Sequence, residues 1–157
     1  MILSKVKPSG DAVIAPAARA SSDALPESED QLHERFAAEY GTPFYAYDAS
    51  EIAARVAELK AVFPSAASTR LMYSFKANPL PSVAGEMQAG GCCADLTSPG
   101  EIAAAHEAGF DMSRALYGGP GNSVGELVAA IESGIRHFSV ESMPDMESLE
   151  EATRLTD

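Results

Sequence analysis

From residue 70 onward, this 157-residue chain alternates short apolar segments with helix-like segments, and this alternation limits its fold more than any other feature. The pattern predicts four strand–helix units of roughly 20 to 24 residues each. Repeated units of this kind form parallel sheets covered by helices. The spacing is compatible with a doubly wound α/β sheet and with half of a (β/α)8 barrel, which needs about 250 residues when complete. The expected strands are 70–76, 92–96, 114–117 and 136–140.

Two more elements are expected before this repeat. A helix begins near Ser28 and ends at Gly41, and a short apolar strand follows at 44–47. Ser28 has Gln31 three residues later, which is the spacing of a capping box. A polar residue also precedes each of three later helices, where its side chain can bind the free N–H groups of the first turn. These expected caps are Asp48, Ser98 and Ser123.

Residues 1–28 differ in composition from the rest of the chain. They are rich in alanine, serine, proline and aspartate, and Pro8, Pro16 and Pro26 interrupt any helical period. A segment of this composition buries little apolar surface when the chain folds. The sequence therefore predicts a disordered tail over 1–28 and a folded domain over 29–157.

The chain is strongly acidic. It carries 11 Lys and Arg against 23 Asp and Glu, which gives a formal net charge of −12 and a pI near 4.5. This charge repels nucleic acid phosphates and anionic lipids. No apolar run approaches the about 20 residues that a bilayer-spanning helix needs. We therefore expect neither a nucleic acid partner nor a membrane-bound state.

The two cysteines, Cys92 and Cys93, are adjacent in a predicted strand. Neighbouring cysteines are poor disulfide partners because the bridge strains the backbone between them. Their spacing is also not that of a metal site, so no metal is predicted. Both are expected to be small buried hydrophobic residues, and their free thiols are typical of the reducing cytoplasm.

One lysine, Lys76, lies at the end of an apolar segment that stops at an Asn-Pro pair, within 71–79 (LMYSFKANP). Two interpretations follow from the residues alone. The first is a surface lysine at a strand end. The second is a lysine removed from water, whose neutral amine can form a Schiff base.

Several segments of the chain, in order between about 40 and 149, resemble the fold-type III decarboxylases that use pyridoxal 5'-phosphate (PLP). This family contains the diaminopimelate, ornithine and arginine decarboxylases. Each resembling segment in the strand–helix repeat falls at the carboxyl end of a predicted strand, where barrel active sites lie. The segments are 40–48 (YGTPFYAYD), 73–78 (YSFKAN), 94–101 (ADLTSPGE), 118–123 (GGPGNS) and 139–142 (SVES).

The resemblance implies a partial (β/α)8 TIM barrel of the alanine racemase and PLP decarboxylase type, comprising about the first four βα units. It implies that 29–157 is the N-terminal part of the PLP-binding domain, with the rest of the barrel and a C-terminal β-domain absent. Lys76 is then the catalytic lysine that binds the cofactor as a Schiff base, and Asp95 is a carboxylate close to it. Ser98 is a further cofactor-binding candidate. Helix capping is by itself a sufficient structural explanation for Ser98 and for Glu101.

Two features depart from the family pattern. Asn122 stands where many members have a lysine in the third βα loop, which could alter contacts with the substrate carboxylate. The family's glycine-rich phosphate loop comes later than any segment of this chain. The glycines at 118–121 do not replace it, because Pro120 removes a backbone donor from that loop.

The function that the resemblance implies is decarboxylation of diaminopimelate or a related basic or carrier-linked amino acid. The complete protein is expected to be a homodimer, and the 157-residue chain alone is expected to be inactive. A truncated homologue that binds family subunits without turnover is an alternative. A PLP-dependent racemase is another alternative. Racemases of this barrel type, however, usually continue into Tyr-Gly-His where this chain has Pro79-Leu80-Pro81.

Overall fold

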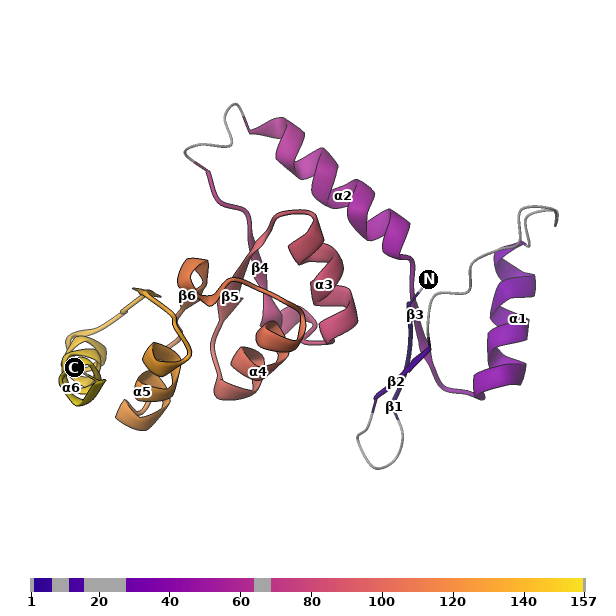
Figure 1. The fold of residues 1–157 in the computed structure, drawn as a ribbon. Coiled ribbons are helices and arrows are strands. Elements are labelled where there is room, and N and C mark those ends of the chain that lie inside the picture. Colours follow the sequence, from indigo (N-terminus) through magenta and orange to yellow (C-terminus); the bar gives the residue numbers. More distant parts are fainter. Residues whose placement is uncertain (1, 7–11, 16–27, 64–68, 157) are drawn as a thin grey trace. The chain divides into compact units, whose positions relative to one another are not determined.

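The computed structural model describes residues 2–6, 12–15, 28–63 and 69–156 (Figure 1). The chain forms two compact units, Met1–Glu51 and Ile52–Asp157. Each unit has its own sheet, the first antiparallel and the second parallel. The described part of the chain contains no helix long and apolar enough to cross a membrane.

The first unit contains a three-stranded antiparallel sheet in the order β2-β1-β3. Its strands are β1 (Ile2–Val6), β2 (Ala12–Ala15) and β3 (Tyr45–Tyr47). The structure therefore differs from the predicted disordered tail at 2–6 and 12–15, while the rest of 1–27 lies outside the described residues. The pairing of β1 with β3, in which Ile2 lies opposite Tyr47, joins distant parts of the sequence. The local composition of the tail therefore does not reveal this pairing.

The first unit also contains α1 (Glu29–Tyr40), which begins with the predicted capping box. Ser28 Oγ accepts from the Gln31 N–H at 3.3 Å, and Gln31 Oε1 accepts from the Ser28 N–H at 3.0 Å. The buried ring of Phe36 packs against Leu32, Tyr40 and Phe44. The predicted caps at Asp48, Ser98 and Ser123 are likewise confirmed.

The second unit contains a four-stranded parallel sheet whose strands lie in sequence order, β4-β5-β6-β7. A helix follows each strand, and α2 (Ala49–Val62) precedes the first (Figure 1). The strands are β4 (Met72–Ser74), β5 (Cys93–Leu96), β6 (Leu116–Tyr117) and β7 (His137–Phe138). The helices are α3 (Pro81–Ala89), α4 (Pro99–Glu107), α5 (Val124–Glu132) and α6 (Met143–Thr156).

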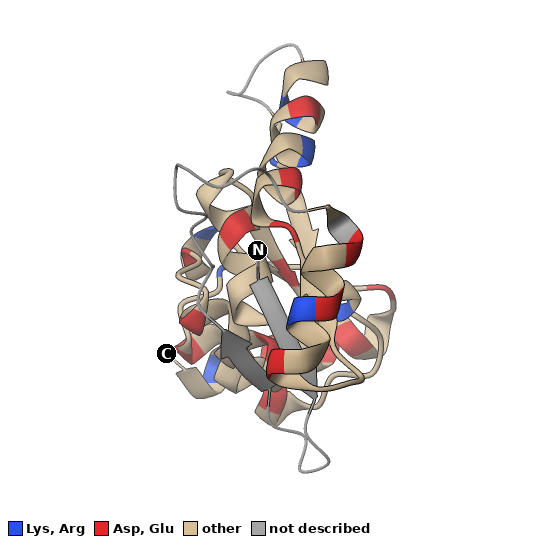
Figure 2. Ribbon diagram, turned by 90° about the vertical axis from the view of Figure 1, so that its right-hand side faces the viewer, with Lys and Arg blue, Asp and Glu red and all other residues tan. Residues whose placement is uncertain are grey.

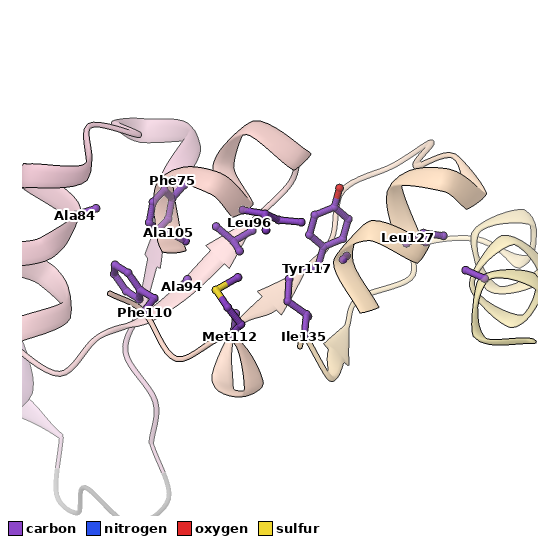
Figure 3. Close-up of a cluster of buried hydrophobic side chains, with 14 residues drawn as sticks. Phe75, Ala84, Ala94, Leu96, Ala105, Phe110, Met112, Tyr117, Leu127 and Ile135 are labelled. Atoms are coloured by element: carbon purple, nitrogen blue, oxygen red, sulfur yellow. The ribbon is translucent and has the colours of Figure 1, made fainter. Parts of the chain in front are cut away.

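The two faces of this parallel sheet have different surroundings. Ala94 and Tyr117 belong to one core cluster with buried residues of all four following helices (Figure 3). Tyr73 and Phe138, on the same face, pack against this cluster. The opposite face carries a paired row formed by Ser74, Asp95, Leu116 and His137. Helices that cover one face of a parallel sheet with sequential strands are the arrangement of a (β/α)8 barrel. The fold is therefore the first four βα units of such a barrel, rather than a doubly wound sheet.

The strand that leads to Lys76 is shorter than the predicted 70–76. It ends at Ser74, and Lys76 lies in the 3-10 turn η1 (Phe75–Ala77). Phe75 is fully buried, with ring centroids 5.4 Å from Tyr73 and 5.3 Å from Phe110. This tertiary anchor turns the chain directly after the strand. The third predicted strand is shortened in a similar way by the 3-10 turn η2 (Met112–Arg114).

The adjacent cysteines behave as predicted. Cys92 and Cys93 are both free and buried, and Cys93 begins β5. Burial raises the pKa of the Cys92 thiol, with a smaller opposing effect from the nearby Lys60 ammonium. Neither residue belongs to a metal-binding cluster, because the described residues hold no group of three or more potential His, Cys, Asp or Glu ligands.

Candidate active site

A hollow of about 510 Å³ opens at the carboxyl ends of the four parallel strands. Parallel strands bring the residues that follow them to one edge of a sheet, which is where barrel enzymes carry their active sites. Each of the four strand ends contributes to this hollow. Its lining residues are Lys76, Asp95, Thr97, Gly118, Gly119, Pro120, Asn122, Ser139 and Glu141.

Lys76 reaches the hollow from the turn that follows β4. Its side chain is exposed and forms no hydrogen bond or ion pair with the described residues. Two neighbours fix the turn around it: the buried Phe75 ring precedes it, and the Tyr73 hydroxyl donates to the Asn78 carbonyl at 2.8 Å. A primary amine carried by an anchored turn, with no competing partner, is available to react with a carbonyl carbon.

Asp95 lies on the helix-free face of β5, paired with Ser74 of the neighbouring strand. Its half-buried carboxylate accepts no hydrogen bond from the described residues, although it lines the hollow with Lys76. The Ser74 hydroxyl is also buried without a partner in the described part of the chain. Buried polar groups are normally hydrogen-bonded. These unmatched groups beside Lys76 are therefore suited to a polar ligand.

Ser98 and Glu101 do not line the hollow, so the structure does not bring Ser98 together with Lys76 and Asp95. Ser98 Oγ accepts from the Glu101 N–H at 3.3 Å and caps α4. The Glu101 carboxylate accepts from the backbone N–H of Thr97 at 2.6 Å and from its hydroxyl at 3.1 Å. Glu101 thus fixes Thr97, a lining residue, instead of bonding back to Ser98 as a capping box would.

The third βα loop is closed by its own asparagine. Asn122 Nδ2 donates to the Gly119 carbonyl at 2.7 Å and to the Gly118 carbonyl at 3.3 Å. Gly119 and Gly121 have φ values of 98° and 78°, a region that side chains disfavour. The Asn122 amide therefore holds the loop in shape, and both of its N–H contacts point to the protein's own backbone.

Sequence reasoning did not single out Thr97, Ser139 or Glu141 as site residues, although it expected their segments at strand ends. The signal that could have found them is position. Each lies one to three residues beyond the last residue of its strand, like Lys76 beyond β4. In a parallel sheet these positions converge on one edge whatever the residue type.

We predict that Gly118→Ala destabilises this edge of the sheet by about 1 to 3 kcal/mol, as overpacking of a filled site does. A Cβ at position 118 would lie 2.1 Å from Ser139 Oγ and 3.4 Å from Ser139 Cβ. Denaturant unfolding measures the effect. The same substitution in a Ser139→Ala background should cost less, because the closest atom is then gone.

Gly125→Ala is the matched control for this substitution, since a Cβ there meets no atom within 4 Å. It lies in α5 and is expected to be neutral or stabilising by up to about 1 kcal/mol. Equal losses for the alanines at 118 and 125 would contradict the close packing of Gly118 on Ser139.

The fold and the hollow define a class: a β/α barrel with a free lysine and a carboxylate at the carboxyl ends of its strands. Residues 49–155 match the family described as pyridoxal-dependent decarboxylase, pyridoxal binding domain. The chain therefore belongs to this family, whose cofactor is PLP and whose enzymes are carboxy-lyases.

Curated relatives and solved structures agree with this assignment. The chain is 36% identical over 116 residues to a diaminopimelate decarboxylase of Mycobacterium bovis, covering 74% of this chain and 26% of the relative. It is 34% identical over 125 residues to that of Zymomonas mobilis, covering 78% and 30%. The structure of the Helicobacter pylori diaminopimelate decarboxylase complexed with L-lysine matches with a TM-score of 0.70 and 29% identity, covering 78% and 31%. The chain thus spans less than a third of the length of these proteins.

The residues around the hollow fit one end of PLP. Lys76 offers an unpaired amine for the aldehyde carbon, and Asp95 and Ser74 offer unmatched polar groups close by. The phosphate end is not matched in the described part of the chain, because Lys76 is the single cation in the lining and the Asn122 amide is bound to the loop. The described residues therefore fit the reactive carbonyl end of the cofactor.

Proposed function

We propose that the complete protein decarboxylates an amino acid, with diaminopimelate or a related basic or carrier-linked amino acid as substrate, and that Lys76 attaches the cofactor. The observation that carries this proposal is the free Lys76 amine in the hollow at the strand ends, in a chain of the PLP decarboxylase family. The identity to diaminopimelate decarboxylases supports the choice of substrate.

The residues of the hollow supply distinct parts of the proposed reaction. Lys76 Nζ would hold the cofactor covalently, and its amine, when free, would act as a base or acid beside the reacting carbon. Bound PLP supplies the electron sink that accepts the electron pair left when the carboxylate departs as carbon dioxide. Asp95 is a negative partner for a protonated nitrogen in the hollow. Glu101 acts indirectly, because its hydrogen bonds fix Thr97 at the rim of the hollow.

Ser98 has the weaker support as a cofactor-binding residue. Its hydroxyl is half-buried and caps α4, and it does not line the hollow. We retain it in the proposal only as a residue that fixes the loop between β5 and α4.

The direct test incubates the purified complete protein with PLP and with diaminopimelate, lysine, ornithine or arginine, and measures released carbon dioxide. We expect release from diaminopimelate at the highest rate and none from the Lys76→Ala variant. If the cofactor binds Lys76 but no amino acid loses carbon dioxide, the alternative of a non-catalytic homologue that binds family subunits is favoured. Inversion of a substrate without carbon dioxide release would indicate a racemase.

We also propose that the complete protein is a homodimer in the cytoplasm. The two buried free thiols, Cys92 and Cys93, support a reducing compartment. Light scattering of the purified protein tests the dimer, and a monomeric mass would contradict it.

We predict that Asp95→Asn weakens cofactor retention about tenfold or more, because it removes the negative charge from a charge-assisted contact. The measurement is the cofactor concentration that restores the visible absorbance of the stripped protein. Asp30→Asn is the matched control, since Asp30 is an exposed residue of α1 in the other unit. Equal affinities for the Asp95 variant and the wild type would remove Asp95 from the proposed site.

A further inference from the structure

A second hollow, of about 320 Å³, lies at the opposite, amino-terminal edge of the parallel sheet. Three of its lining residues directly precede adjacent strands: Leu71 precedes β4, Gly91 lies two residues before β5, and Arg114 lies two residues before β6. It shares no residue with the hollow around Lys76. The full lining is Lys60, Phe63, Thr69, Arg70, Leu71, Gly91 and Arg114.

Three of these lining residues are cations, and none is a carboxylate. Such a cluster of positive charges is unusual for this chain, in which acidic residues far outnumber basic ones (Figure 2). Of the other basic residues in 52–157, Arg55 and Arg154 form ion pairs with a glutamate on their own helices, and Lys76 lies in the other hollow. The remaining one, Arg136, donates to the carbonyls of Ile131 and Ile135.

One of the three cations has a hydrogen-bond partner. Lys60 Nζ donates to the Gly90 carbonyl at the end of α3, at 2.8 Å. It also lies over Gly91, where an added Cβ would be 2.8 Å from Nζ and where φ is 85°. Because Gly91 has no side chain, the Lys60 ammonium has room above it. A side chain at position 91 would displace the ammonium.

Helix capping accounts for Lys60 but not for the two arginines. Arg70 has a single hydrogen-bond contact with the described residues, 3.3 Å from Nη1 to His137 Nε2. Arg114 forms no hydrogen bond through its side chain to the described residues. The carboxylate of Asp111, which feels the charge of Arg114, is already bonded to the N–H and hydroxyl of Ser113, at 3.0 and 2.7 Å. The two guanidinium groups thus face the hollow without a carboxylate partner.

We propose that this hollow is a binding site for a small multivalent oxyanion of the phosphate ester class. Planar guanidinium groups bind phosphoryl oxygens in pairs, and an ammonium adds a point charge beside them. The hydroxyl of Thr69 adds a neutral donor, and Phe63 gives an apolar wall for an organic portion of the ligand. The site lies at the end of the barrel away from Lys76, so its occupant takes no part in the reaction proposed there.

Calorimetric titration of the cofactor-loaded protein with pyrophosphate, at constant ionic strength set by chloride, tests this site. We expect saturable one-to-one binding that leaves the visible absorbance of the cofactor unchanged. Arg70→Gln and Arg114→Gln should each weaken the affinity about tenfold or more. Arg154→Gln, which removes the same charge from the exposed end of α6, should change it less than about twofold.

Footprinting of the unmodified protein gives a second measurement that needs no variant. Pyrophosphate should protect Arg70 and Arg114 from the arginine reagent phenylglyoxal, as mapped by mass spectrometry, and should leave Arg154 reactive. The proposal is overturned by an absence of saturable binding, by displacement of the cofactor, or by equal effects of the three arginine variants. None of these outcomes bears on the attachment of the cofactor to Lys76.

Discussion

Lys76→Ala is expected to abolish covalent attachment of the cofactor and to reduce decarboxylation by several orders of magnitude, about 10³-fold or more. The variant loses both the amine that binds the aldehyde and the group that can transfer a proton beside the reacting carbon. The wild-type side chain is exposed and forms no hydrogen bond or ion pair with the described residues, so its removal should leave the fold intact. The visible absorbance of the bound cofactor and the rate of carbon dioxide release measure the two losses.

Lys76→Arg is the matched variant, because it keeps a positive charge of similar length. A guanidinium stays protonated and cannot act as a nucleophile, so this variant should lose the cofactor absorbance as completely as the alanine variant. Unchanged urea unfolding midpoints for both variants would show that the fold is intact. Near-normal turnover in either variant would contradict the role proposed for Lys76.

Phe75→Ala is expected to destabilise the second unit by about 3 to 5 kcal/mol, the usual cost of emptying a buried aromatic site. Phe75 is fully buried and lies edge-on to Tyr73 and Phe110. It also anchors the turn that carries Lys76, so cofactor attachment should weaken even where the variant remains folded. Urea unfolding at low temperature measures the first effect, and cofactor absorbance measures the second.

Leu155→Ala is the matched control for the Phe75 variant. Leu155 is a large apolar residue of α6 that is 66% exposed, so its truncation should cost less than about 0.5 kcal/mol. A loss below about 1 kcal/mol for Phe75→Ala would contradict the core that the structure describes around the turn.

The sequence predicted those features that depend on local chemistry. Ser28, Asp48, Ser98 and Ser123 were identified as caps because a cap is a contact between a side chain and the backbone two or three residues away. The edge shared by Lys76 and Asp95 followed from the strand–helix repeat, since parallel strands align their carboxyl ends.

Features that depend on distant contacts were missed or misplaced. The strand before Lys76 ends early because Phe75 packs on Phe110, 35 positions away in the chain. The strand at 2–6 pairs with 12–15 on one side and with the distant 45–47 on the other, which composition does not report. Glu101 bonds to Thr97 and Asn122 bonds to its own loop, although each side chain has several other possible hydrogen-bond partners nearby. Only the folded geometry decides between them.

The most direct test of the proposed cofactor site is to identify the lysine that carries the cofactor. Borohydride reduction of the cofactor-loaded protein, followed by proteolysis and mass spectrometry, converts the attachment into a stable label on one peptide. The other lysines of this chain are Lys5, Lys7 and Lys60. We predict that the label is found on the peptide containing Lys76, and a label on any other lysine, or none at all, would contradict the proposed site.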